Sequence, residues 1–244
     1  MMNNTRRIAS LIGAMVLAAA SAAGYASFES HRLHPYLGLA VLALAAATSR
    51  MKVKLPGING NMSVNLPFLL TAIINLSAAE AVLVTCVSTT VQCWPRKNAR
   101  FNAQQMTFNL SMMAFASSVA TMLAHAGWLA GNTAALPALP GLILASLALF
   151  LGQTIPVAGI VAVSEHKQAS RLWWELAHLS FPYYAVSAGM TSMLQSVGGH
   201  LGWGLALAVF PVMYMLHRCY RLYFSRMVES MRTDVLVRAA GAGA

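Results

Sequence analysis

Residues 63–94 read SVNLPFLLTAIINLSAAEAVLVTCVSTTVQCW, and their only charged side chain is Glu80. This stretch is too long for one ordinary membrane-spanning helix and too short for two of about 20 residues each. Within it, Ser77-Ala-Ala-Glu80 matches a capping box, which begins a new helix, and Pro67 suits the first turn of the helix before it. The pattern therefore predicts two short half-helices that meet near Leu76 and Ser77, as a re-entrant hairpin or as two thin, tilted spans.

The composition of the whole chain indicates that lipid covers most of its surface. Hydrophobic residues make up 58% of the 244 residues and charged residues only 9%, whereas a soluble domain carries about 25%. The net charge of +10 would suggest nucleic acid in a soluble protein, but the basic residues lie in short segments between apolar runs. We therefore expect an all-α polytopic membrane bundle and no nucleic-acid partner.

The positions of the basic residues predict the topology. Fifteen of the 16 Lys and Arg residues lie in five segments, whereas Arg32 stands alone between the first two spans and the connections near 131–137 and 198–200 hold no Lys or Arg. This asymmetry places the five segments in the cytoplasm. Basic segments flank both ends of 63–94, so this run must enter and leave on the same side. We predict six full spans plus the broken pair, with both termini cytoplasmic, in a bacterial inner membrane. The apolar runs are 8–28 (an uncleaved first span), 35–48, 63–94, 106–130, 139–163, 175–197 and 201–216.

Polar residues within the apolar runs are candidates for a ligand site. Glu80 is the only acidic residue deep in such a run, and intramembrane carboxylates often mark functional sites, although the capping box offers a structural role. Pro156 and Pro182 lie inside later apolar runs, and each leaves the carbonyl group four residues earlier, at Gly152 and His178, without its helical hydrogen bond. Gln153 and Thr154 lie beside Pro156. The candidate ligand-binding residues are Asn75, Ser77, Glu80, Gln153, His178, Tyr183 and Tyr184.

The sequence gives no sign of catalysis, a cofactor or a metal site. No phosphate loop, nucleophile elbow or dinucleotide fingerprint occurs, and six acidic residues leave little material for acid–base chemistry. Glu175 and His178 have the Glu-x-x-His spacing of di-iron proteins, but no second copy exists. An ion pair between Arg171 and Glu175, four residues apart, accounts for that glutamate.

The chain divides into a membrane-embedded domain, residues 1–217, and a cytoplasmic segment, residues 218–244. In the second segment, apolar residues recur at helical spacing between arginines. This pattern is typical of a helix that lies on the cytoplasmic leaflet or docks on a partner. The residues expected at this surface include Arg218, Arg221, Arg226 and Arg232.

One resemblance covers nearly the whole chain. Lys52-Val-Lys-Leu-Pro-Gly-Ile-Asn-Gly-Asn-Met-Ser-Val-Asn65, then Leu76-Ser-Ala-Ala-Glu80, Val91-Gln-Cys-Trp94 and Tyr220-Arg-Leu-Tyr223, resembles the N-terminal membrane input domain of bacterial signalling proteins. In these proteins, often from acidobacteria, the domain precedes a GGDEF diguanylate cyclase or an HD-type cyclic-dinucleotide phosphodiesterase. The resemblance implies a sensing or ligand-binding role. Because the chain ends where the catalytic domain would start, the resemblance implies neither cyclase nor phosphodiesterase activity.

Three functions remain open from the sequence. The first is a membrane sensor that binds a small molecule and signals to a cytoplasmic partner, or within a homodimer, through the tail. The second is a small-solute transport subunit, since the architecture resembles the substrate-binding component of energy-coupling-factor transporters. The third is a structural or assembly factor of a membrane complex. The lipid bilayer is a partner in all three.

Overall fold

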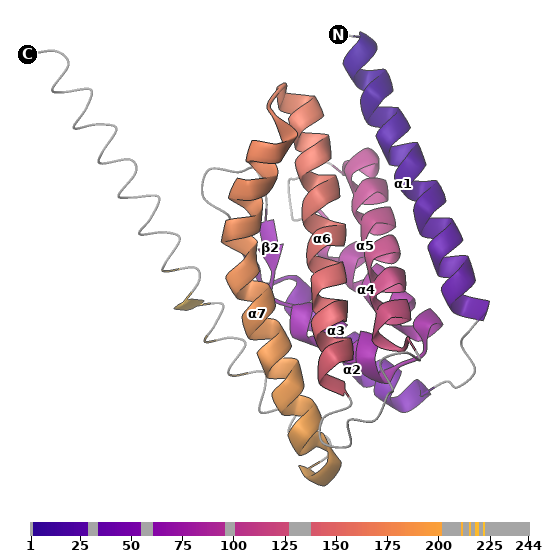
Figure 1. Ribbon diagram of the computed structural model, residues 1–244, viewed down its shortest axis with the longest axis vertical. Helices are drawn as coiled ribbons and strands as arrows, with labels where there is room; N and C mark the ends of the chain where they lie inside the picture. Colours follow the sequence, from indigo (N-terminus) through magenta and orange to yellow (C-terminus); the bar gives the residue numbers. More distant parts are fainter. Residues whose placement is uncertain are drawn as a thin grey trace, which may run out of the picture.

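The computed structural model describes residues 2–28, 34–54, 61–95, 101–126 and 138–201, and also residues 211, 215, 218, 219 and 222. The predicted last span, 201–216, and most of the tail lie outside the described residues. The described part contains seven helices and a two-stranded hairpin (Figure 1). The elements are α1 (Met2–Phe28), α2 (Pro35–Ser49), β1 (Lys52–Lys54), β2 (Asn61–Ser63), α3 (Leu66–Asn75), α4 (Ala78–Cys93), α5 (Ala103–Ala124), α6 (Ala138–Glu165) and α7 (Ala169–Leu201).

The helices form a bundle in which the short helix α3 is enclosed by longer ones. Helices α5, α6 and α7 lie side by side, and α1 runs along the outside of α5 (Figure 1). Helix α3 contacts α2, α4, α5, α6 and α7. Its residues Leu69, Leu70 and Ile73 are fully buried. Ten residues are too few to cross a bilayer, which needs about 20, so α3 gains its stability from burial among its neighbours.

Within the described residues, three helices are long and apolar enough to cross a membrane. They are α1 over Arg6–Tyr25, α5 over Ala103–Ala124 and α6 over Leu139–Glu165. Helices α2, α3 and α4 are apolar but shorter. The predicted class, a helical membrane bundle, is therefore confirmed in its coarse form.

Helices α5 and α6 approach each other closely through small residues. A Cβ atom at Gly152 would lie 2.8 Å from the Cβ of Ala116, and one at Gly141 would lie 2.8 Å from the carbonyl oxygen of Ala124. Both distances are shorter than real side chains tolerate. Small residues commonly form the contacts between membrane helices because they let the two backbones pack together. These two glycines therefore set the spacing between α5 and α6.

Many buried hydroxyl groups in the bundle donate hydrogen bonds within their own helix. In α4, Thr85 and Thr89 donate to the carbonyls of Ala81 and Thr85, and in α5, Thr121 donates to that of Ser117. Such bonds to the residue four positions earlier satisfy a hydroxyl without water. These buried polar residues are thus compatible with dry contacts between helices.

The hairpin of β1 and β2 was not predicted. The strands are antiparallel, and Lys52, Val53 and Lys54 pair with Ser63, Met62 and Asn61. The intervening sequence contains Pro-Gly and Asn-Gly, which are turn signals. The hairpin is hard to predict from the sequence because each strand has only three residues and the apolar pattern dominates its surroundings. The apolar run 63–94 therefore starts at the end of β2 and becomes helical only at Leu66.

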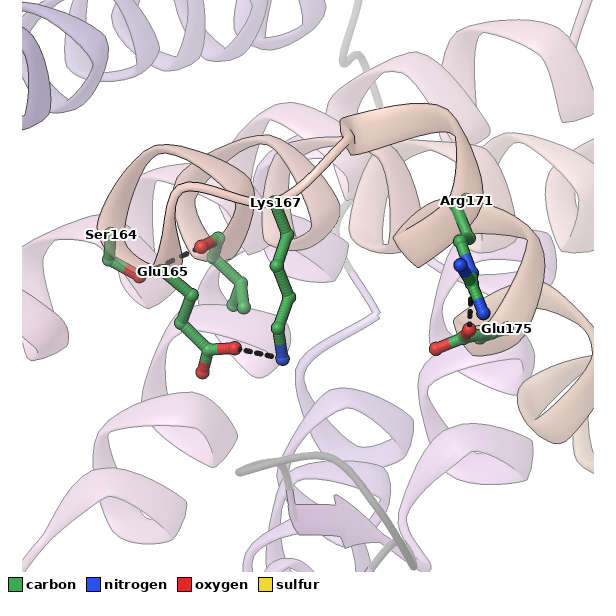
Figure 2. Close-up of polar contacts among 6 residues, drawn as sticks. Ser164, Glu165, Lys167, Arg171 and Glu175 are labelled. Carbon is green, nitrogen blue, oxygen red and sulfur yellow. Dashed lines mark hydrogen bonds and ion pairs between the residues drawn. The ribbon is translucent and has the colours of Figure 1, made fainter.

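The turn between α6 and α7 is closed by backbone bonding and carries a cluster of charged residues. His166 has a positive φ of 55°, and the amide of Lys167 donates to the carbonyl of Ala162, 3.1 Å away. This pattern is a Schellman C-cap, in which His166 takes the position that usually holds glycine. Figure 2 shows the ion pairs of Lys167 with Glu165, at 2.6 Å, and of Arg171 with Glu175, at 3.4 Å.

The ion pair predicted between Arg171 and Glu175 is therefore confirmed. Both side chains are exposed, so the pair contributes little to stability. In the turn, the hydrogen bond from Lys167 to the Glu165 carboxylate raises the pKa of the lysine, which stays charged. The turn therefore presents both signs of charge at the end of the bundle predicted to face the cytoplasm.

Replacing His166 with valine is expected to destabilise this turn by about 1–2 kcal/mol, because a β-branched side chain opposes a left-handed backbone. His166→Gly should keep the stability of the wild type, since glycine adopts a positive φ without steric cost. Thermal unfolding in detergent measures both variants. Gln168→Val adds the same side chain at an exposed position two residues later and is the control. Equal melting temperatures for the two valine variants would contradict the prediction.

Candidate functional site

The predicted break between two half-helices is present. Helix α3 ends at Asn75, Leu76 has an extended backbone (φ −108°, ψ 163°), and α4 begins at Ala78. Ser77 is the N-cap of α4: its hydroxyl accepts from the Glu80 amide, and the Glu80 carboxylate accepts from the Ser77 amide. The predicted capping box and the predicted role of Pro67 in the first turn of α3 are both confirmed.

The Glu80 carboxylate joins α4 to the beginning of α2. Its Oε2 accepts from the amide and the hydroxyl of Ser77, at 3.1 and 2.8 Å, and its Oε1 accepts from the His34 amide at 2.8 Å. His34 is the N-cap residue of α2 and has no side-chain cap of its own. The carboxylate therefore lies between the N-terminal ends of two helices, where their dipoles favour a negative charge. This geometry favours the structural interpretation of Glu80.

His125, at the end of α5, holds the C-terminal end of α3. Its two ring nitrogens lie 3.0 Å from the carbonyl oxygen of Thr121 and 3.3 Å from that of Ile74. Asn75 is exposed and donates to the carbonyl of Thr71 within α3. The ends of α3 and α5 therefore meet the beginnings of α2 and α4 in one polar cluster.

A second polar cluster surrounds the N-terminal end of α3. The hydroxyl of Tyr183 accepts from the Leu66 amide at 3.2 Å, and Thr191 donates to the carbonyl of Pro67 at 3.2 Å. The side chain of Asn65 donates to the hydroxyl of Ser88 at 2.5 Å, and Ser88 donates to the carbonyl of Ala45 at 3.4 Å. These bonds join the beginning of α3 to α7 and α4, and α4 in turn to α2.

The second cluster contains residues that the sequence analysis did not select. Asn65, Ser88 and Thr191 are buried, and none of them carries a charge that would mark it in an apolar run. Asn65 precedes Leu66-Pro67, and an asparagine before a helix-starting proline is a recognisable N-cap signal. The pairing of Asn65 with Ser88 and of Thr191 with Pro67 depends on contacts between helices, which no local pattern reveals.

The predicted aromatic residues lie inside the bundle. Tyr183 and Tyr184 are buried, and the ring of Tyr184 packs edge-on against Phe150 with centroids 5.2 Å apart. The indole of Trp173 donates to the hydroxyl of Thr154 at 3.1 Å, which ties the beginning of α7 to α6. The two tyrosines therefore belong to the packed core of α6 and α7.

The predicted ligand-binding residues form no single group. Asn75, Ser77 and Glu80 lie at one end of α3 and Tyr183 at the other, about 14 Å away by the rise of an α-helix. Gln153 is half-buried on α6, and His178 is exposed on α7, where its ring packs against Trp174 with centroids 4.5 Å apart. The described residues place these candidates in separate environments.

Two features bear on the chemistry of these clusters. Ser187 is fully buried on α7, one turn from Tyr183 and one from Thr191, and its hydroxyl has no hydrogen-bond partner among the described residues. The described part of the chain contains no group of three or more His, Cys, Asp or Glu side chains placed to hold a metal ion. Of the predicted tail surface, Arg218 is described and exposed, whereas Arg221, Arg226 and Arg232 lie outside the described residues.

Comparison with known proteins identifies no relative. No protein-family model, no curated protein and no solved structure matches the chain. The function must therefore be argued from the arrangement of the residues themselves.

Proposed function

We propose that this chain is a membrane-embedded sensory module that binds a small polar molecule between α3 and α7 and signals to a cytoplasmic partner. In this proposal it lies in a bacterial inner membrane with six full spans, the broken pair α3–α4 and both termini in the cytoplasm. The observation that carries the proposal is the contact between α3 and α7, in which Tyr183 and Thr191 bond the first turn of α3 on either side of the buried Ser187 hydroxyl.

The Ser187 hydroxyl supports a ligand at this contact. An unsatisfied hydroxyl in a buried environment costs about 1–3 kcal/mol. A small molecule with a polar group that reached Ser187 would recover that energy, and its apolar part would contact the aromatic core around Tyr184 and Phe150. The ligand class is therefore a small polar molecule that carries a hydrogen-bonding group and a short apolar part.

The position of α7 supports signalling. Helix α7 carries both hydrogen bonds to the first turn of α3, and it precedes the basic segment that contains Arg218. A ligand that displaced the first turn of α3 would therefore move the helix that leads to the tail. The transport alternative relied on Asn75 and Glu80 as cavity residues. The hydrogen bonds of Glu80 within the chain favour the α3–α7 contact as the ligand site instead.

Ligand binding is tested by identifying the small molecules that stay with the purified protein in lipid nanodiscs. We expect mass spectrometry to find a polar small molecule in the wild type and to lose it in Ser187→Ala. Ser146→Ala is the matched control, because Ser146 is also buried with an unpartnered hydroxyl but lies on α6. No retained molecule in the wild type, or equal retention in Ser187→Ala, would contradict the proposal.

Signalling is tested at the exposed Cys219, which reports on the tail. In a chain with Cys86→Ala and Cys93→Ala, Tyr183→Phe removes the hydroxyl that accepts from Leu66 and keeps the ring. We expect this change to alter the rate at which Cys219 reacts with a soluble maleimide. Tyr184→Phe is the control, because Tyr184 is equally buried but packs against Phe150. An unchanged rate in Tyr183→Phe would show that the contact is not coupled to the tail.

A further inference from the structure

His125 places both nitrogens of its ring against carbonyl oxygens. Nδ1 lies 3.0 Å from the oxygen of Thr121, one turn earlier in α5, and Nε2 lies 3.3 Å from the oxygen of Ile74, in the last turn of α3. A carbonyl oxygen only accepts hydrogen bonds, so each contact needs an N–H group on the ring. A neutral imidazole has one N–H group, whereas an imidazolium has two. The geometry therefore fits the protonated, positively charged form of His125.

The surroundings of His125 favour a positive charge. His125 is the C-cap residue of α5, and Ile74 lies one residue before the end of α3. The last carbonyl groups of a helix have no partner within it, and together with the helix dipole they stabilise a cation. The ring thus lies at the C-terminal ends of two helices, whereas the Glu80 carboxylate lies at the N-terminal ends of α2 and α4.

Few other titratable groups occupy this end of the bundle among the described residues. Helix α3 and the first two turns of α6 contain none, α4 contributes Glu80, α2 contributes His34 and Tyr36, and α1 contributes Tyr25. Of these residue types, only histidine ordinarily changes its charge between about pH 5 and 8. Four more charged or titratable residues, whose side chains lie outside the described part, occur between α1 and α2 and in the last turn of α7: Glu29, His31, Arg32 and His200.

We propose that His125 is a pH-sensitive latch, which fixes the C-terminal end of α3 to α5 while its ring is protonated. When the exposed ring releases a proton to water, one nitrogen keeps a lone pair that faces a carbonyl oxygen, and the two acceptors repel each other. One of the two hydrogen bonds is then lost, and the end of α3 is no longer fixed to the end of α5.

The latch lies far from the turn between α6 and α7. Helix α5 ends beside the beginning of α6, where a Cβ at Gly141 would meet the carbonyl of Ala124, at the opposite end of the bundle from that turn (Figure 1). In the proposed topology, His125 therefore responds to the pH on the side of the membrane opposite the cytoplasm. The latch does not require a ligand at Ser187, so this inference and the proposed ligand site can fail separately.

A spin label at the end of α3 tests the latch. In a chain whose three native cysteines are replaced by alanine, Asn75→Cys carries the label, because Asn75 is exposed and adjacent to Ile74. In lipid nanodiscs, we expect the label to become more mobile as the pH rises from about 5 to 8. His125→Gln should keep the label mobile throughout this range. His125→Arg keeps a permanent charge and several N–H groups, so it should keep the label immobile.

Thermal unfolding as a function of pH gives a second measurement. Because proton loss removes a hydrogen bond, the wild-type midpoint should fall between about pH 5 and 8, by about 2–4 °C more than that of His125→Gln. His34→Gln is the matched control, because it replaces the other described histidine at this end but keeps the backbone amide that donates to Glu80. It should retain the wild-type profile. A label at Gln168→Cys, exposed beside the turn between α6 and α7, should not respond to pH.

The outcomes separate the latch from other sources of pH dependence. Label mobility that is independent of pH in the wild type, or that follows the wild-type profile in His125→Gln, would overturn the proposal. A profile that is lost in His34→Gln and kept in His125→Gln would assign the response to His34 and would also overturn it. If His125→Gln does not fold, His125→Arg decides, since a profile that persists with a permanent charge cannot come from this ring.

Discussion

Replacing Glu80 with alanine is expected to lower the free energy of unfolding by about 2–3 kcal/mol. Three donors lose their acceptor at once: the amide and hydroxyl of Ser77 and the amide of His34. A hydrogen bond to a charged group contributes about 1.5–3 kcal/mol, and loss of a helix cap costs about 1 kcal/mol. Because Glu80 is only half-buried, water will replace part of this loss. The beginnings of α2 and α4 should both become less stable.

Denaturant titration of the purified protein in detergent measures the effect. Glu80→Gln keeps the shape and one acceptor oxygen but loses the charge, so its destabilisation should fall between wild type and Glu80→Ala. Glu175→Ala removes an exposed carboxylate from a surface ion pair and should change stability by less than about 1 kcal/mol. Wild-type stability in Glu80→Ala, with loss of a bound small molecule, would instead assign Glu80 to ligand binding.

Replacing Gly152 with leucine is expected to lower the free energy of unfolding by roughly 2–3 kcal/mol, because it overpacks the contact between α5 and α6. Even the first added carbon atom would lie 2.8 Å from the Cβ of Ala116 and 3.2 Å from its Cα. These neighbours belong to a helix backbone and a short side chain, so neither can move aside without shifting α5. The two helices would have to separate, and α1, which packs along α5, would shift with them.

Gly159→Leu is the matched control for this substitution. It lies on the same helix, and a Cβ there would meet nothing within 4 Å. Both variants gain the same helix propensity over glycine, so the difference between them isolates the packing term. Thermal unfolding in detergent should give a lower midpoint for Gly152→Leu than for Gly159→Leu. Equal midpoints would mean that α5 and α6 do not pack as closely as the two glycines indicate.

Local patterns predicted the break between the half-helices correctly. The capping box is a contact between residues three positions apart, so Ser77 and Glu80 form it whatever surrounds them. The same reasoning applies to the pair of Arg171 and Glu175, one helical turn apart. The chemical partners in these cases are encoded within a few residues, and reading the sequence is sufficient to find them.

The tertiary structure decided what the polar residues contact. Glu80 was selected as a possible ligand site, yet its second acceptor oxygen bonds the amide of His34, 46 positions away in the chain. Tyr183 was selected for its aromatic ring, yet its hydroxyl accepts from Leu66, a helix-start amide 117 positions away. Neither partner amide has a sequence signature, because every residue except proline carries one.

By itself, the sequence determined a helical membrane protein with a broken helix at residues 75–78, because hydrophobic run length and helix capping are local properties. Only the tertiary structure decided that the first half-helix lies enclosed in the bundle and is bonded at its two ends to different neighbours. Burial and long-range hydrogen bonds depend on which helices pack together, and this depends on the shape of whole surfaces. The break is present where the sequence predicts it, but the contact with α7 at the far end of α3 carries the functional proposal.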